Sequence, residues 1–130
     1  MQTKLYIFDL DDTLVRYGKH KFCVPKQTFH MLRRLHNEGH KIVIITYNPL
    51  GTNLVKLTKL NKYVKEVVYG TEYRHLLLYK FLQSYDDIFT YVDDRKDNIQ
   101  CIKEHYPNAT TVHVANPLLL YKLMLDLKRE

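Results

Sequence analysis

Acidic side chains gather where two apolar, strand-like runs end. The run Lys4–Phe8 is followed by three aspartates within four residues, starting at Asp9, and the run Ile88–Val92 is followed by Asp93 and Asp94. The carboxyl ends of parallel strands meet at one edge of a sheet, where ligands of α/β folds bind. Carboxylates brought together there repel one another unless a hard divalent cation lies between them, and oxygen donors suit Mg²⁺. The pattern therefore indicates either a magnesium site or acidic residues that cap the next helices in solvated turns.

The elements that would position these residues alternate along the chain. The expected strands are short apolar or β-branched runs at Lys4–Phe8, Lys41–Thr46, Glu66–Tyr69, Ile88–Val92 and Thr110–Val114. The expected helices are amphipathic segments at Pro25–Gly39, Gly51–Leu60, Glu72–Ser84, Arg95–Tyr106 and Pro117–Lys128. Strand and helix in turn, five times, predict an α/β fold with a parallel sheet and helices on both of its faces.

Length and composition limit the classes of protein that fit. The chain has 130 residues, which predicts one domain over residues 1–130. No apolar run reaches the roughly 18 residues that span a bilayer. We expect no secretion signal, no membrane partner and a cytoplasmic location, with Cys23 and Cys101 as reduced thiols. The histidines are expected to be surface or packing residues, because His30, His36 and His40 are spread along one helix and its exit, and His75, His105 and His113 have no cysteine or carboxylate partner at ligand spacing.

Three of these segments together resemble the motifs of the haloacid dehalogenase (HAD) superfamily of phosphotransferases. Phe8–Leu14 (FDLDDTL) is similar to its first motif, Ile42–Thr46 to its second, and Tyr91–Asp94 (YVDD) to its fourth. The resemblance covers essentially the whole chain. It implies a Rossmann-like three-layer sandwich with a five-stranded sheet, in the order 5-4-1-2-3 by position in the chain. The pattern looks closest to the small magnesium-dependent phosphatases of that superfamily.

The resemblance assigns roles to five residues. It implies that Asp9 is the nucleophile, which forms an aspartyl-phosphate, and also a ligand of Mg²⁺. Asp11 matches the acid and base, and its backbone carbonyl is implied as a further metal ligand. Thr46 would bind the phosphate through its hydroxyl, although a strand-end threonine also caps helices. Asp94 matches the metal-binding acid, and Asp93 joins it or orients a metal-bound water.

The third motif of the superfamily, a cation that reaches the phosphate, has two candidates here. Arg74 lies in the first turn of the expected helix, where the family cation usually sits, and shares a face with Leu77 and Leu78. Lys80 lies in the middle of the same helix, roughly opposite Leu78. Arg74 is favoured, and both remain candidates.

The spacing of the motifs indicates which substrates the site admits. Family members carry cap domains between the first and second motifs or between the second and third. Residues 14–45 and 47–73 have room for neither. The resemblance therefore implies an open site. It suits a bulky phosphorylated substrate, such as a nucleic-acid end or a phosphoprotein, and leaves a small phosphate ester as an option. A homo-oligomer, in which a neighbour acts as lid, also fits.

The net charge of +6 divides unevenly along the chain. Segments 9–12 and 86–97 hold eight of the 14 acidic residues but only two of the 20 basic ones, so the rest carries 18 bases against six acids. Lys56, Lys59 and Lys62 recur every three residues and predict a basic stripe on one helix. Such a stripe either attracts a polyanion such as nucleic acid or is a solvated lysine face.

The function predicted from these features is a Mg²⁺-dependent phosphomonoesterase. The alternative is a non-catalytic phosphate-binding or interaction module, either a degenerate member of the same superfamily or a receiver-like domain. A receiver domain would carry its acceptor aspartate at the end of the third strand. The chain has Tyr69-Gly70-Thr71 there, which weighs against that alternative.

Overall fold

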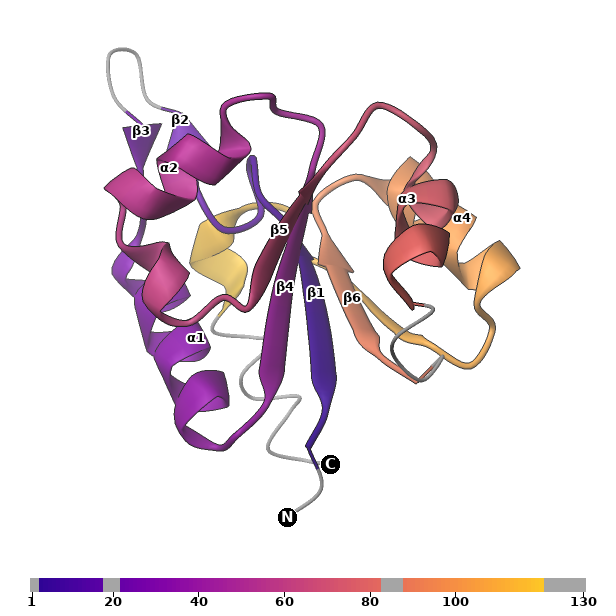
Figure 1. Cartoon of the computed structure of the whole chain (residues 1–130), viewed down its shortest axis with the longest axis horizontal. Coiled ribbons are helices and arrows are strands. Elements are labelled where there is room, and N and C mark those ends of the chain that lie inside the picture. The colour runs from indigo at the N-terminus through magenta and orange to yellow at the C-terminus, as the bar shows by residue number, and fades with distance from the viewer. Residues whose placement is uncertain (1–2, 18–21, 83–87, 121–130) are drawn as a thin grey trace.

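A five-stranded parallel sheet forms the middle layer of the computed structural model, which describes residues 3–17, 22–82 and 88–120 (Figure 1). From one edge to the other, its strands are β5 (Glu66–Tyr69), β4 (Lys41–Thr46), β1 (Leu5–Asp9), β6 (Thr90–Asp93) and β7 (Thr110–His113). Read from the other edge, this is the predicted order 5-4-1-2-3. In the centre of the sheet, Phe8 of β1 pairs with Ile44 of β4 and Val92 of β6.

Helices cover both faces of this sheet, as Figure 1 shows. One face carries α1 (Lys26–Asn37), α2 (Gly51–Leu57) and the short 3₁₀ helices η1 (Leu60–Lys62) and η2 (Pro117–Leu119). The other face carries α3 (Arg74–Leu82) and α4 (Lys96–His105). The predicted three-layer α/β sandwich is therefore confirmed.

The alternation of side chains along β1 determines which layer each residue of the strand meets. Tyr6 and Phe8 are buried in the core beneath α1, whereas Leu5 and Ile7 are buried in the core beneath α3 and α4. Asp9 follows the same alternation as Ile7, so its side chain lies on the side of the sheet that α3 and α4 cover. Burying a side chain such as Phe8 or Ile7 contributes about 1.5–3 kcal/mol, so the apolar core fixes the direction of Asp9 firmly.

Several predicted boundaries were wrong, among them those of the strand predicted over Ile88–Val92, which covers Thr90–Asp93. The first strand covers Leu5–Asp9 rather than Lys4–Phe8, so Asp9 is a strand residue. The helix predicted over Gly51–Leu60 ends at Leu57, where the Thr58 hydroxyl donates to the carbonyl of Leu54 at 2.7 Å. Lys59 then takes a left-handed conformation (φ 65°), which separates α2 from η1. Of the helix predicted over 117–128, the structure describes only the beginning, η2, and residues 121–128 lie outside the described residues.

The connections between the strands are small. In the described residues, β1 and β4 are joined by an antiparallel pair, β2 (Arg16–Tyr17) and β3 (Phe22–Cys23), and by α1. Residues 47–73 form α2, η1, β5 and their loops. Neither connection contains a cap domain within the described ranges, as the spacing predicted. Every helix in those ranges is too short or too polar to cross a bilayer.

Candidate active site

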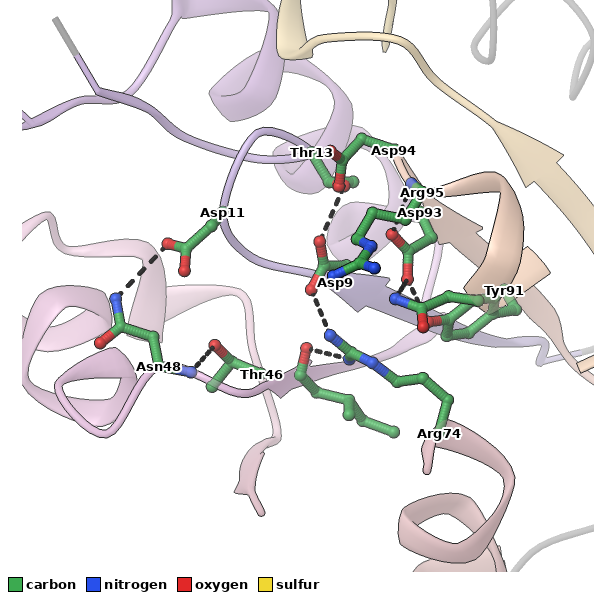
Figure 2. Close-up of polar contacts among 12 residues, drawn as sticks. Asp9, Asp11, Thr13, Thr46, Asn48, Arg74, Tyr91, Asp93, Asp94 and Arg95 are labelled. Carbon is green, nitrogen blue, oxygen red and sulfur yellow. Dashed lines mark hydrogen bonds and ion pairs between the residues drawn. The ribbon is translucent and has the colours of Figure 1, made fainter. Parts of the chain in front are cut away.

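Three carboxylates meet at the carboxyl edge of the sheet (Figure 2). Asp9 is the last residue of β1, Asp93 is the last residue of the neighbouring strand β6, and Asp94 follows it. One carboxylate oxygen from each lies within 4.8 Å of the others. The parallel pairing of β1 with β6 brings these side chains together across more than 80 residues of sequence. We call them the acidic cluster.

Asp93 is held in place by three donors. The hydroxyl of Tyr91 and the side-chain amide of Asn98, at 3.0 Å, both donate to Oδ2, and the backbone N–H of Arg95 donates to Oδ1 at 2.9 Å. Tyr91 and Asp93 lie two residues apart on β6 and therefore point to the same side of the sheet. Asp93 is fully buried, so these bonds replace the water that a carboxylate would otherwise require.

Thr13 connects the other two carboxylates of the cluster. Its hydroxyl lies 3.3 Å from Oδ2 of Asp9 and 3.2 Å from Oδ1 of Asp94. One hydroxyl proton is shared between the two acceptors, so neither bond has full strength. Burial and the charge of Asp93 both raise the pKa of Asp94 above its usual range.

Arg74 supplies positive charge to the site from the first residue of α3. One guanidinium nitrogen donates to Oδ1 of Asp9 at 2.6 Å, and another donates to the carbonyl of Ile45 at 2.7 Å. The ring of Tyr47 lies 4.2 Å from the guanidinium carbon, in a cation–π contact. Arg74 is only 2% exposed, and its Nε has no hydrogen-bond partner among the described residues. The site therefore holds a buried N–H donor that still needs an acceptor.

The charges of the site do not balance. Three carboxylates face the single guanidinium of Arg74. Burial and, next to it, the charge of Asp93 raise the pKa of Asp9 to about 8, although Arg74 acts in the opposite direction. A divalent cation would relieve this repulsion. Closely spaced carboxylate oxygens are the donors that hard cations such as Mg²⁺ take. The residues present therefore fit the predicted metal.

Thr46 and Asp11 lie on the other side of Asp9, toward α2. Thr46 ends β4, is buried, and accepts a hydrogen bond from the backbone N–H of Asn48 at 2.9 Å, which leaves its own hydroxyl proton to be donated. Asp11 is half-buried, and its Oδ1 lies 3.5 Å from the side-chain nitrogen of Asn48. Figure 2 shows the Asp11 carboxylate apart from the acidic cluster, beside Asn48.

The structure thus brings together four of the predicted site residues and places Thr46 and Asp11 on the other side of Asp9. Asp9, Asp93 and Asp94 form the acidic cluster, and Arg74 is bonded to Asp9. The side chain of Lys80, the second predicted cation, lies outside the described part of the chain. Its position in α3 is six residues after Arg74, about 9 Å further along the helix axis.

Sequence reasoning missed the polar contacts of two residues. The sequence motif that contains Tyr91 gave its hydroxyl no role, yet the hydroxyl donates to Asp93. Its spacing of two from Asp93 on a strand could have revealed this. Thr13 likewise had no chemical role assigned from its motif, and its hydroxyl bonds to two carboxylates. The contact with Asp94 spans 81 residues and had no local signal.

Comparisons with known proteins agree with this geometry. Residues 6–67 match the model of a family described as haloacid dehalogenase-like hydrolases. Among solved structures, the fold is similar to the N-terminal part of a Bacteroides fragilis protein, described as containing a phosphatase domain complexed with Mg. The TM-score is 0.75 and the identity 16%, over 95% of this chain and 39% of that one. A search of curated proteins found no match. Residues 6–67 of this chain are thus similar to haloacid dehalogenase-like hydrolases, and the whole chain shares its fold with the phosphatase-containing part of the Bacteroides fragilis protein.

Proposed function

We propose that this protein is a Mg²⁺-dependent phosphomonoesterase that works through a phosphoryl group on Asp9. One observation carries the proposal: three buried or half-buried carboxylates and a buried arginine converge at the carboxyl edge of the sheet. This arrangement suits phosphoryl transfer, where catalysis is mostly positioning and neutralisation of charge. The phosphatase domain with Mg in the similar structure supports the same function. We assign the activity to one catalytic domain over residues 1–130.

The acidic cluster would hold the metal. Asp9, Asp93 and Asp94 offer carboxylate oxygens, and the backbone carbonyl of Asp11 is the fourth protein donor that we propose. When bound, Mg²⁺ would supply positive charge that offsets the repulsion between the phosphate and the carboxylates. Tyr91, Asn98 and the backbone of Arg95 keep Asp93 oriented for that role.

The first step is attack by Asp9. An oxygen lone pair of its carboxylate forms a bond to phosphorus, and the bond between phosphorus and the leaving oxygen breaks. Arg74 and the Thr46 hydroxyl would donate hydrogen bonds to the phosphoryl oxygens, which gives the unpartnered Nε of Arg74 an acceptor. To bind phosphate, the guanidinium shares its donors between Asp9 and the substrate.

Asp11 would move the protons. In the first step its carboxyl gives a proton to the leaving oxygen, and the alcohol departs. In the second step its carboxylate takes a proton from a water molecule, which attacks phosphorus and releases phosphate and the Asp9 carboxylate. Asp11 stands outside the acidic cluster and beside Asn48, on the side where a leaving group would sit.

Substrate access is the feature that favours bulky phosphate esters. The described connections contain no cap over the site. A cleft of about 260 Å³ between α1 and the end of α2, lined by none of the proposed site residues, carries the basic side chains Arg33, Lys59 and Lys62. These charges would attract a polyanion, such as a phosphorylated nucleic-acid end, more than a small ester. A phosphoprotein with an acidic surface fits the same charges.

Hydrolysis of an aryl phosphate tests the proposed function. We expect turnover in Mg²⁺, reversible loss in EDTA and loss in Asp9→Asn. Asp12→Asn is the matched control, because Asp12 is exposed and asparagine tolerates its positive φ of 63° equally well. Full activity in Asp9→Asn, or equal loss in both variants, would contradict the proposal. Activity on phosphorylated oligonucleotides that falls steeply with added salt would support the nucleic-acid substrate.

One observation favours the non-catalytic alternative. Arg74 is bonded directly to Asp9, so one oxygen of the proposed nucleophile is already occupied. A protein that only binds phosphate would show saturable binding of inorganic phosphate, dependent on Arg74, with no hydrolysis of any phosphate ester. The same assay in Mg²⁺ separates the two functions.

A further inference from the structure

A second cluster of ligand-type side chains lies on α3 and α4, apart from the acidic cluster. His75 is the second residue of α3, and Cys101 and His105 are one turn apart on α4. One ligand atom from each lies within 4.8 Å of the others. The prediction that these histidines have no cysteine partner was wrong, because the partner of His75 comes from a different helix, 26 residues later. The catalytic account gives none of the three a role.

We propose that His75, Cys101 and His105 bind one Zn²⁺ ion, which joins the start of α3 to α4. A thiolate and two imidazoles are the donors that zinc takes in proteins. The same donors discriminate against Mg²⁺, which prefers oxygen ligands, so the two clusters select different metals. His75 and Cys101 are half-buried and His105 is exposed, which leaves a path for the ion and a fourth position for water.

One hydrogen bond of His105 leaves the lone pair of its other ring nitrogen available to a metal. Its Nδ1 lies 2.9 Å from the backbone carbonyl of Cys101. A carbonyl can only accept, so Nδ1 carries the proton and Nε2 keeps its lone pair. Zinc-binding histidines are commonly oriented in this way, with the second ring nitrogen donating to a backbone carbonyl or a carboxylate.

The other two ligand atoms are already in contact. Nδ1 of His75 lies 3.1 Å from Sγ of Cys101, so the imidazole and the thiol share one proton. A metal ion that binds both atoms displaces this proton into solvent, as expected when zinc replaces protons on its ligands. The carbonyl of His75 also accepts from the hydroxyl of Tyr106 at 3.3 Å, which ties this end of α3 to the end of α4.

Binding requires one rearrangement. The rings of His75 and His105 are stacked, with centroids 3.7 Å apart and planes at 10°. Lone pairs in parallel planes do not converge on one point, so one ring must tilt. His105 is exposed and can tilt without displacing packed neighbours. Because Arg74 immediately precedes His75, zinc would also fix the helix start that presents the guanidinium to Asp9.

Titration of the whole chain with Co²⁺ and then Zn²⁺ tests the site. The protein is first freed of transition metals and is then kept in excess Mg²⁺, which occupies the acidic cluster. We expect one Co²⁺ per chain, with the charge-transfer absorption of a cobalt–thiolate bond, and its displacement by Zn²⁺. Cys101→Ser should abolish the absorption and weaken Zn²⁺ binding at least tenfold, whereas Cys23→Ser, which changes the other free cysteine, should leave both unchanged.

His105→Ala and His30→Ala form a second pair of variants. His105→Ala should weaken Zn²⁺ binding at least tenfold, and His30→Ala, an exposed histidine on α1, should not. Circular dichroism of each variant confirms that it folds. A wild-type titration without thiolate absorption would overturn the proposal. So would absorption that survives Cys101→Ser, or absorption that requires two chains per metal. None of these readouts depends on phosphatase activity.

Discussion

The ion pair between Arg74 and Asp9 permits a quantitative prediction. The two side chains are 2% and 9% exposed and 2.6 Å apart. Arg74→Met keeps an unbranched side chain that fills the inner part of the arginine's space but removes the positive charge nearest three carboxylates. Breaking a buried pair by removing one partner costs about 3–5 kcal/mol. We therefore expect Arg74→Met to lower the free energy of unfolding by about that amount in EDTA at a pH above 8, where Asp9 is ionised, and by less in Mg²⁺, which replaces part of the lost charge.

A double-mutant cycle isolates the pair from the other contacts of Arg74. The free energy of unfolding is measured by urea denaturation for the wild type, Arg74→Met, Asp9→Asn and the double variant. Because Asp9→Asn removes the charge that Arg74 balances, the loss caused by Arg74→Met should be smaller in that background. We expect a coupling energy of about 2–3 kcal/mol, the upper part of the range for residues in contact.

An exposed ion pair provides the matched control. Arg34 and Glu38 lie one turn apart on α1 at 3.0 Å, with side chains 41% and 35% exposed. Arg34→Met should cost no more than about 1 kcal/mol. The reasoning is refuted if Arg74→Met costs no more than Arg34→Met, or if the coupling energy is within error of zero.

Three further predictions concern the same site. Tyr91→Phe removes a donor to the Asp93 carboxylate and should lower the free energy of unfolding by about 1.5–3 kcal/mol in urea denaturation. Gly51→Ala would place a Cβ 2.6 Å from Cγ2 of Thr46, so we expect a loss of about 1–3 kcal/mol together with slower aryl phosphate hydrolysis. The third concerns pH: because the pKa of Asp9 rises from 3.8 to about 8 on folding, the folded metal-free protein binds the proton more tightly. Protonation of Asp9 therefore stabilises the folded protein fully below pH 3.8, and this stabilisation is lost as the pH rises through 8. The difference in stability between wild type and Asp9→Asn in EDTA should follow that curve, and a difference that is independent of pH would contradict it.

Sequence patterns located the sheet well, because the strands carry strong local signals. Lys41–Thr46 and Glu66–Tyr69 were predicted to the residue, since β-branched runs between polar residues leave little choice of boundary. The end of α2 was not foreseen. Lys59 adopts a left-handed conformation without being glycine or asparagine, and the Thr58 hydroxyl bonds back onto the preceding turn. Neither feature has a distinctive sequence pattern.

The site was predictable where topology alone decides position. Asp9 and Asp93 come from neighbouring strands, and the rule that ligands bind at carboxyl ends places them together. Contacts that depend on how helices pack could not be predicted from the sequence by this rule. The bond from Arg74 to Asp9 depends on where α3 begins relative to the end of β1, and the contact between His75 and Cys101 depends on how α3 lies against α4.

Trapping a phosphoryl group on Asp9 tests the central claim most directly. An aryl leaving group needs little help from an acid, whereas release of phosphate needs Asp11 as a base, so Asp11→Asn should accumulate the phosphorylated enzyme. The variant is mixed with an aryl phosphate and Mg²⁺, quenched in acid and analysed by peptide mass spectrometry. We predict one added phosphoryl group on the peptide that contains Asp9, absent when Asp9→Asn is added to the variant. A phosphoryl group on another residue, or one that persists without Asp9, would contradict the mechanism.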